Sequence, residues 1–419
     1  MNFVVKNIFI WYSFISLLSL FSATTLSVFD ISTAIIIMWI IFIFFHLTSN
    51  YRCSSRDRLF LVSKFEKILY ENEFRFLFFA LIAFGCCLYS VYYYTGLSVF
   101  SLLKLVISGD SLYTLYQEYF KENSIGQFSF LKIPAILSQV FMKLALVFAF
   151  YLFIVSNVKL TFLNKTCLSI VILSYVIFSV SRGTSFEFFE ILMLTWFSFQ
   201  AKGDISPSVS SSMKRNMFLL ALSIFFLSIY SYNVSARYQH VDDYVINCVS
   251  PDMCLDRESF LYYASPGLAI LSLKLSGYFV IGLHYTSYFF ENIFFSSSIN
   301  TLEFILPFSS VYTELSVGFL CDSKLECGPT WKPDFTAFTI KYGIFINLAS
   351  IVLIFSLCRL SLKSWEKKVS FVDFSILFFC FLFIISLPIG NFISSSSSNF
   401  LTFLILITLK VLYGKYYVR

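Results

Sequence analysis

Charged residues are scarce in this sequence. Asp, Glu, Lys and Arg together make up 13% of the 419 residues, whereas 58% of the residues are hydrophobic. Soluble domains average about 45–50% apolar and about 25% charged residues. The chain contains only 3 His, 14 Gly and 8 Pro, and no internal repeat is evident. This composition excludes an ordinary soluble domain and indicates an integral membrane protein.

Apolar runs long enough to cross a bilayer recur along the chain. A helix needs roughly 17–25 residues to span about 30 Å of hydrocarbon. Ten segments meet or approach that length: 5–23, 31–48, 75–95, 133–156, 166–181, 184–200, 216–234, 341–358, 371–388 and 398–414. The sequence therefore predicts an all-α fold, a polytopic transmembrane bundle of about ten spans.

Lys and Arg are distributed unevenly between the two sides that these spans define. The positive-inside rule assigns the side richer in Lys and Arg to the cytoplasm. With both termini cytoplasmic, that side holds nineteen of the 30 basic residues: Lys6, Arg52, Arg56, Arg58, Lys64, Lys67, Arg75, Lys159, Lys165, Lys202, Lys214, Arg215, Arg359, Lys363, Lys367, Lys368, Lys410, Lys415 and Arg419. We therefore expect spans one to seven in 1–234, one long outer loop in 235–340, and spans eight to ten in 341–419.

Four cysteines lie in the long outer loop. Cys248 and Cys254 have five residues between them, and so do Cys321 and Cys327. An even set confined to one outer loop suggests disulfides formed in an oxidising compartment. We expect each cysteine to pair with its near neighbour, although four cysteines allow three connectivities. Zinc is the alternative, and the absence of His at ligand spacing disfavours it.

An apolar stretch within the loop, 261–295, is interrupted by Lys274, Gly277, Gly282, His284 and Glu291. Apolar helices with a polar face lie in the membrane interface rather than across the bilayer. We therefore expect one or two amphipathic helices that lie on the outer surface or dip into it. A crossing here would place the basic cluster at 359–368 outside, against the charge rule.

Three charged residues stand in an apolar context in SRGTSFEFFE, 181–190: Arg182, Glu187 and Glu190. A charge at membrane depth is costly unless it is solvated, paired or used. The SRG tripeptide is predicted to form a tight outer turn, after which the two glutamates share one helix face. In a structural interpretation, Lys143 of span four pairs with Glu190, and Arg182 pairs with Glu187.

The other interpretation is an anion site at the outer membrane surface. Arg237, in SARYQH, lies on the same side as Arg182, and Arg257, Lys332 and Lys341 lie in the long loop or at its end. Guanidinium groups bind phosphate oxygens bidentately and stay charged at any working pH. Such a cluster suits a diphosphate.

Short motifs resemble those of a known family. They are the SRG turn (181–183), the segment PGLAILSLKLSGYFVIGL (266–283), and the stretch TWKPDFTAFTIKYG (330–343) leading into the next span. With the predicted topology, they resemble the bacterial O-antigen polymerases of the Wzy type. The Arg-x10-Gly spacing described for some members is absent, because Arg257 and Gly267 are one residue too close.

The resemblance implies glycosyl transfer at the periplasmic face of the bacterial inner membrane. A nascent glycan on undecaprenyl diphosphate would move onto the non-reducing end of a second lipid-linked repeat unit. The expected partners are undecaprenyl-diphosphate-linked oligosaccharide, membrane lipid and a separate chain-length regulator protein; no nucleic acid is expected.

This reaction requires positive charge for the departing diphosphate, a base for the acceptor hydroxyl, and aromatic faces for the sugars. The candidates are Arg182, Arg237, Arg257 and Lys332 for the diphosphate, Glu187, Glu190 and His284 for the base, and Tyr262, Tyr263 and Trp331 for the sugars. For the three aromatic residues, anchoring at the membrane interface is the alternative. The first outer loop offers a single carboxylate, Asp30, so we expect neither a metal nor another cofactor.

Other classes of protein remain open at this point. A flippase or transporter for the same lipid-linked sugars would place charges near the midplane, as Lys143 and Glu190 are, but would be expected to show repeated halves and small outer loops. An O-antigen ligase shares the donor chemistry and a similar layout. A membrane scaffold is the remaining alternative.

Overall fold

The computed structural model describes residues 2–49, 59–60, 73–108, 112–123, 130, 132–156, 161–184, 186–205, 247–250, 253–293, 333–342, 344–390 and 396–416, with eight positions between 217 and 231. Within these residues, regular structure is almost entirely helical. The predicted all-α class is therefore confirmed.

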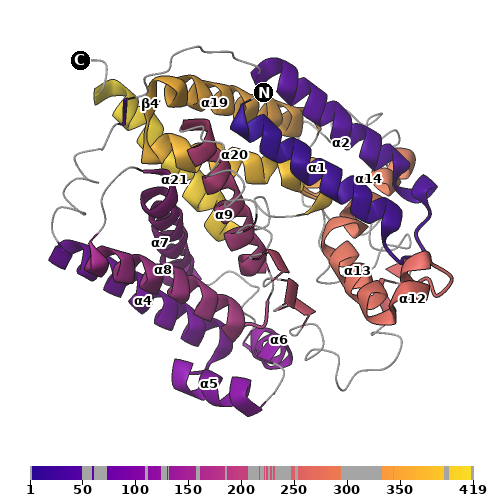
Figure 1. Cartoon of the computed structure of the whole chain (residues 1–419), viewed down its shortest axis with the longest axis horizontal. Helices are drawn as coiled ribbons and strands as arrows, with labels where there is room; N and C mark the ends of the chain where they lie inside the picture. Colours follow the sequence, from indigo (N-terminus) through magenta and orange to yellow (C-terminus); the bar gives the residue numbers. More distant parts are fainter. Residues whose placement is uncertain are drawn as a thin grey trace. The chain divides into compact units, whose positions relative to one another are not determined.

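Seven helices in this part of the chain are long and apolar enough to cross a membrane (Figure 1). They are α1 (Phe3–Phe21), α2 (Val28–Ser49), α4 (Glu73–Thr95), α7 with the π-helix η1 (Lys132–Phe150 and Tyr151–Val155), α8 (Phe162–Ser181), α19 (Ile344–Lys367) and α20 (Phe371–Ile389). Each coincides with a predicted span. The chain is therefore a helical membrane protein by composition and by helix length.

The other three predicted spans differ from these seven. Helix α9 (Phe186–Ile205) forms where the sixth span was expected, but it carries Glu187, Glu190, Lys202 and Asp204. Helix α21 (Ser397–Tyr416) has a described apolar stretch, Ser397–Leu412, that is shorter than the other spans. Segment 216–234 lies largely outside the described residues. The expected total of ten spans is not confirmed.

The chain divides into two compact units. Unit 1 consists of Met1–Arg52, Val241–Leu362 and Phe379–Ser396, and unit 2 of Cys53–His240, Lys363–Phe378 and Ser397–Arg419. In unit 1, α2 packs against α1 and against α14 (Ile281–Tyr288). In unit 2, α4 lies beside α8 and α7, and α21 packs on α7 (Figure 1). Each unit therefore joins segments that are far apart in the sequence.

Helix α1 illustrates how an all-apolar helix is placed in such a unit. Val5, Ile8, Tyr12 and Ile15 recur at three- and four-residue spacing and are completely buried, whereas Leu17 is 55% exposed. Because the exposed side is as apolar as the buried side, it suits lipid rather than water.

Short strands supplement the helices in both units. In unit 2, β1 (Leu59–Phe60) pairs in parallel with β4 (Lys368–Val369). In unit 1, β2 (Cys248–Ser250) pairs antiparallel with β3 (Met253–Cys254), so that Cys248 lies opposite Cys254. These two cysteines form a disulfide with an S–S distance of 2.04 Å, which confirms that predicted pair. The other expected pair, Cys321 and Cys327, lies outside the described residues.

The apolar stretch 261–295 differs from its expected form. It folds as α12 (Phe260–Ala264), α13 (Pro266–Phe279), α14 and the π-helix η2 (Phe289–Ile293), with a bend of 45° between α13 and α14. Residues 272–277 are buried without a break. A run of six buried residues covers every side of a helix, so this part does not lie flat on the surface, and the expected alternative of helices that dip into the membrane stays open. The bent pair has the length and composition of a broken span or a re-entrant loop.

Three of the residues that suggested a polar face, Lys274, Gly277 and Gly282, make contacts inside unit 1. The ammonium group of Lys274 donates a hydrogen bond to the Cys248 carbonyl at 3.3 Å, and Lys274 itself is 4% exposed. Gly277 lies against the side chain of Val249, and Gly282 lies against the backbone of Ile389. These interruptions of the apolar run therefore serve internal packing.

Helix α20 contains Pro388 one residue before its end. Because proline has no N–H, the carbonyl of Ile384, four residues earlier, lacks its helical donor. The Tyr12 hydroxyl of α1 donates to that carbonyl at 2.6 Å, and the Thr286 hydroxyl of α14 donates to the Pro388 carbonyl at 3.1 Å. An unsatisfied carbonyl is costly where no water reaches it. Side chains of two other helices therefore stabilise this helix end.

Tyr12→Phe is expected to lower the free energy of unfolding by about 1–3 kcal/mol, because it leaves the buried Ile384 carbonyl without a donor. The measurement is thermal unfolding of the purified protein in detergent. Tyr92→Phe is the matched control, because Tyr92 is 62% exposed on α4. Equal stability of the two variants would show that the Tyr12 hydrogen bond contributes nothing.

Candidate functional site

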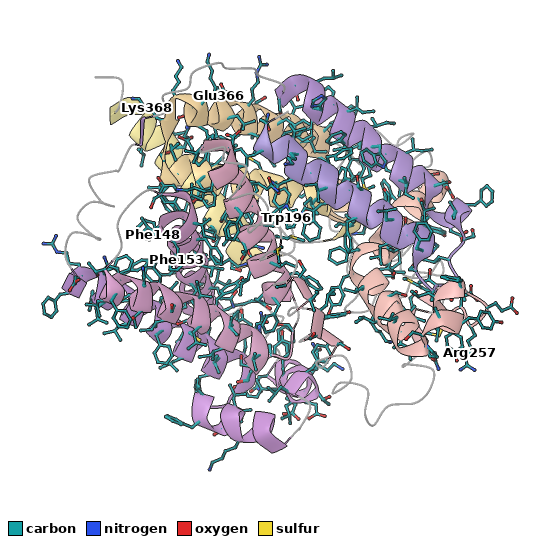
Figure 2. All side chains as sticks on the ribbon, in the orientation of Figure 1. Phe148, Phe153, Trp196, Arg257, Glu366 and Lys368 are labelled. Atoms are coloured by element: carbon teal, nitrogen blue, oxygen red, sulfur yellow. A yellow bond between two sulfur atoms is a disulfide. The ribbon has the colours of Figure 1, made fainter. Side chains whose placement is uncertain are left out.

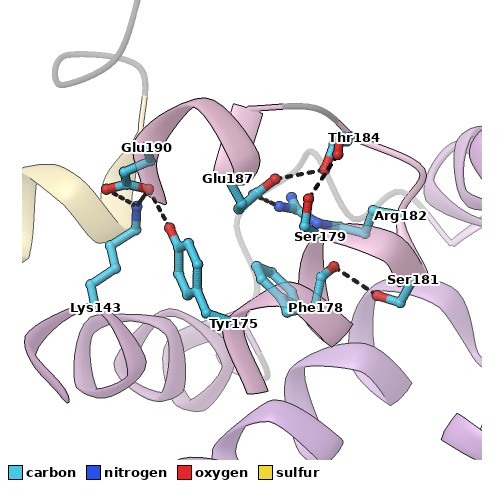
Figure 3. Close-up of polar contacts among 9 residues, drawn as sticks. All are labelled: Lys143, Tyr175, Phe178, Ser179, Ser181, Arg182, Thr184, Glu187 and Glu190. Atoms are coloured by element: carbon cyan, nitrogen blue, oxygen red, sulfur yellow. Dashed lines mark hydrogen bonds and ion pairs between the residues drawn. The ribbon is translucent and has the colours of Figure 1, made fainter. Parts of the chain in front are cut away.

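The turn between α8 and α9 contains the SRG tripeptide (Figure 3). Arg182 is the C-cap of α8, and Gly183 follows with φ of 58°. The Gly183 N–H donates to the Val180 carbonyl at 2.9 Å, and the Thr184 N–H donates to the Ser179 carbonyl at 3.2 Å. These two bonds define a Schellman motif, in which glycine is favoured at the left-handed position. The predicted tight turn is present.

Gly183 is needed for a second reason. A Cβ at this position would lie 2.7 Å from the backbone nitrogen of Tyr113, in the first turn of α6 (Leu112–Glu122). The α8–α9 turn therefore packs directly on the backbone of another helix of unit 2. This close contact brings the aromatic residues of α6 toward Arg182.

The Arg182 guanidinium lies among aromatic rings. Its central carbon is 4.1 Å from the centroid of the Phe178 ring, 5.8 Å from that of Tyr94 and 5.9 Å from that of Tyr116. A cation within about 6 Å of a ring centroid is attracted by the ring's quadrupole. The Arg182 side chain is 14% exposed, so a small part of it remains accessible.

Glu187 is the ion-pair partner of Arg182. The Nη2 group of Arg182 contacts Oε1 of Glu187, whose side chain is 6% exposed. The Thr184 hydroxyl donates to Oε2 of Glu187 at 2.7 Å, and the Ser179 hydroxyl donates to the Thr184 carbonyl at 2.8 Å. Both oxygens of Glu187 therefore already have donors. This arrangement suits a carboxylate that orients Arg182 better than one that accepts a proton from a substrate.

A second ion pair lies one turn further along α9 (Figure 3). The Lys143 ammonium of α7 donates to both oxygens of Glu190, at 3.0 and 2.8 Å, and the Tyr175 hydroxyl of α8 donates to Oε2 of Glu190. Exposure is 5% for Lys143, 3% for Glu190 and 1% for Tyr175. Both ion pairs of the structural interpretation are thus present, and the Lys143 cluster (Lys143, Tyr175 and Glu190) joins three helices.

The two pairs differ in what they offer a ligand. The Lys143 cluster is closed, because its carboxylate oxygens are occupied and its side chains are covered. Arg182 is more open: a guanidinium has five N–H donors, and its buried Nε has no hydrogen-bond partner within the described part of the chain. Arg182 is therefore the group in this turn that is able to bind an anion.

The other predicted site residues lie elsewhere or outside the described residues. In unit 1, Arg257 is exposed (Figure 2), Tyr262 is half-buried and Tyr263 is 76% exposed. His284 of unit 1 is half-buried on α14, with its ring centroid 6.1 Å from that of Tyr285. Arg237, Trp331 and Lys332 lie outside the described residues. The structure therefore brings together Arg182, Glu187 and Glu190, and does not test the grouping of the others.

Sequence reasoning missed the aromatic residues of this site. Phe178 precedes Arg182 by four residues on the same helix, and that spacing predicts a contact. Tyr94 lies in the last turn of α4 and Tyr116 lies on α6, both far from Arg182 along the chain. Among 26 Tyr and 55 Phe, no sequence signal marks these two tyrosines.

These features define an all-α polytopic membrane protein with an aromatic-lined arginine at a helix–helix turn. No family model matches the chain, and no curated protein and no solved structure matches it significantly. The resemblance to O-antigen polymerases therefore stays a prediction.

Proposed function

We propose that the chain is an O-antigen polymerase that binds a polyprenyl diphosphate through Arg182. The observation that carries this proposal is the state of the guanidinium: it stacks on Phe178, pairs with Glu187, and keeps a buried Nε–H without an acceptor in the described part of the chain. Preorganised positive charge in a site poor in water stabilises a departing diphosphate. Arginine suits this role because its planar fork matches phosphate oxygens.

The proposed reaction takes place at the periplasmic face of the bacterial inner membrane. The bond between the anomeric carbon of the nascent glycan and the donor diphosphate breaks. A new bond forms between that carbon and the acceptor hydroxyl oxygen of the second lipid-linked repeat, and a base takes the hydroxyl proton. Undecaprenyl diphosphate leaves with its negative charge on the oxygens that Arg182 contacts. The Cys248–Cys254 disulfide supports an oxidising compartment for its segment of unit 1.

The proposed base in this reaction is one of three residues: Glu187, Glu190 or His284. The first two have both carboxylate oxygens occupied, so each would have to give up a partner before it accepts a proton. His284 is half-buried on α14, and its ring lies beside that of Tyr285. Arg257, Arg237 and Lys332 remain proposed diphosphate ligands, and Tyr262, Tyr263 and Trp331 remain proposed sugar contacts.

Arg182→Ala is expected to abolish the lipopolysaccharide ladder in a strain that lacks the gene and carries the variant at wild-type expression. Arg182→Lys should restore only part of it, because an ammonium cannot stack or bind bidentately. The measurement is the ladder on a gel. Arg359→Ala is the control, because Arg359 is exposed on α19. A full ladder with Arg182→Ala, or in the strain without the gene, contradicts the proposal.

The same gel separates a polymerase from the two competing functions, and the polymer on the lipid carrier separates those two from each other. Loss of a polymerase leaves core bearing a single repeat, because repeats still reach the outer face. Loss of a flippase leaves bare core, because no repeat is delivered. Loss of a ligase also leaves bare core, with polymer retained on the lipid carrier. The flippase is the second candidate, favoured by the buried Lys143 cluster at the centre of three helices.

A further inference from the structure

Helix α6 covers the Arg182 turn in unit 2. Its first turn lies against Gly183 through the backbone of Tyr113, and further along the helix the ring of Tyr119 lies against Gly96, just beyond the end of α4. Between these two contacts, Tyr116 presents its ring to the Arg182 guanidinium at 5.9 Å. Helix α6 therefore packs on the α8–α9 turn through Tyr113 and on the end of α4 through Tyr119.

Three helices each contribute one ring to the surroundings of Arg182: Tyr94 from α4, Tyr116 from α6 and Phe178 from α8. Ring faces attract the cation and exclude water from it, but they do not replace a hydrogen-bond acceptor of ordinary strength. With Nη2 directed at Glu187, the Nε–H is buried and lacks an acceptor among the described residues. A buried donor in this condition is costly until an acceptor arrives.

We propose that Tyr94, Tyr116 and Phe178 form an aromatic cage that positions Arg182, and that the buried Nε–H receives a phosphate oxygen of the ligand. Tyr116 acts through Arg182 and is a positioning residue. The cage holds the planar cation in one orientation, while Glu187 pairs with the neighbouring Nη2 group. The identity of the ligand as a diphosphate rests on the proposed function; the cage itself rests on the contacts described above.

The test is the affinity of the purified full-length protein in detergent for inorganic pyrophosphate, measured by isothermal titration calorimetry. Tyr116→Ala is expected to weaken binding by about 5- to 30-fold, the range that a desolvated cation–π contact provides. Tyr116→Phe keeps the ring and is expected to bind within about 2-fold of wild type. Tyr92→Ala is the matched control, because Tyr92 is a largely exposed tyrosine of unit 2.

A parallel titration with undecaprenyl diphosphate in the same detergent distinguishes a lipid-borne diphosphate from a free one. Weaker binding by Tyr116→Ala in either titration, with rescue by Tyr116→Phe, supports the cage. Unchanged binding by Tyr116→Ala in both titrations overturns it, and so does equal loss with alanine and phenylalanine. Absence of wild-type binding to both ligands overturns the phosphate site.

These outcomes are independent of the ladder. If the ladder is complete with Arg182→Ala or without the gene while pyrophosphate binding depends on Tyr116, the polymerase proposal is rejected and the cage is kept. If the ladder requires Arg182 but the binding affinity does not depend on Tyr116, the cage is rejected and the polymerase proposal is kept.

Discussion

Glu190→Ala is expected to lower the free energy of unfolding by about 3–5 kcal/mol, the cost of leaving one member of a buried ion pair uncompensated. Lys143 is 5% exposed and donates to both oxygens of Glu190. Without Glu190, the ammonium would stay charged in an apolar bundle or lose its proton there, and either outcome is unfavourable. Thermal unfolding in detergent measures the loss.

The control replaces the whole Lys143 cluster with apolar residues of similar size: Lys143→Met, Tyr175→Phe and Glu190→Leu together. A buried charged group replaced completely by packed hydrophobic residues is often neutral or stabilising, so this variant should unfold within about 1 kcal/mol of wild type or above it. Loss of stability equal to that of Glu190→Ala would show that packing, rather than an unpaired charge, explains the single variant.

The triple variant also decides the role of Glu190. If Glu190 is the base of the proposed reaction, the folded triple variant gives no ladder. If the cluster only holds three helices in register, the ladder persists. This experiment therefore separates the two interpretations that the sequence left open for Lys143 and Glu190.

Gly282→Ala is expected to be the second severe change, with a loss of about 3 kcal/mol of stability. A Cβ at Gly282 would overlap the backbone carbonyl of Ile389, at the end of α20. A backbone group cannot move aside by a change of rotamer, as a side chain can. Helix α14 would have to move away from α20, and the hydrogen bond from Thr286 to the Pro388 carbonyl would be lost with it. Thermal unfolding in detergent is again the measurement.

Gly267→Ala is the control for this prediction. Gly267 lies in the first turn of the neighbouring helix α13, and nothing lies within 4 Å of a Cβ built there. The added methyl group should be neutral, or stabilising by a few tenths of a kcal/mol through helix propensity. If the two alanine variants unfold alike, the close contact of α14 with α20 is absent from the protein in solution.

Much of the fold could be predicted because apolar length alone determines spanning helices. Seven predicted spans coincide with α1, α2, α4, α7, α8, α19 and α20. The packing of the segment containing Lys274 and Gly282 could not be predicted, because a charge or glycine in an apolar run indicates either a polar face or an internal contact. Only tertiary structure distinguishes the two: Lys274 reaches the Cys248 carbonyl, and Gly282 admits the α20 backbone.

The candidate site was predictable where its contacts are local. The turn at Arg182 and its pairing with Glu187 follow from residues five apart across one tight turn. The pairing of Lys143 with Glu190 was one of the two interpretations that the sequence left open, and the structure contains it. Tyr116 was not predictable, because its approach to Arg182 depends on how α6 packs on the turn, which local sequence does not encode.

In the Schellman turn, Arg182 has two roles: it is the cap of α8 and the proposed ligand of an anion. The direction of the Arg182 side chain is therefore fixed by the position at which α8 ends. One inserted residue within α8 would rotate everything beyond it by about 100° and turn the guanidinium away from Tyr94 of α4 and Tyr116 of α6, even if every side chain were kept. Exposed positions of α8, such as Leu173 at 54% exposure, tolerate exchange among apolar residues. The number of residues between Tyr175 and Gly183 must stay the same, because it sets the rotation of the helix at Arg182. In this segment, spacing carries more information than residue identity.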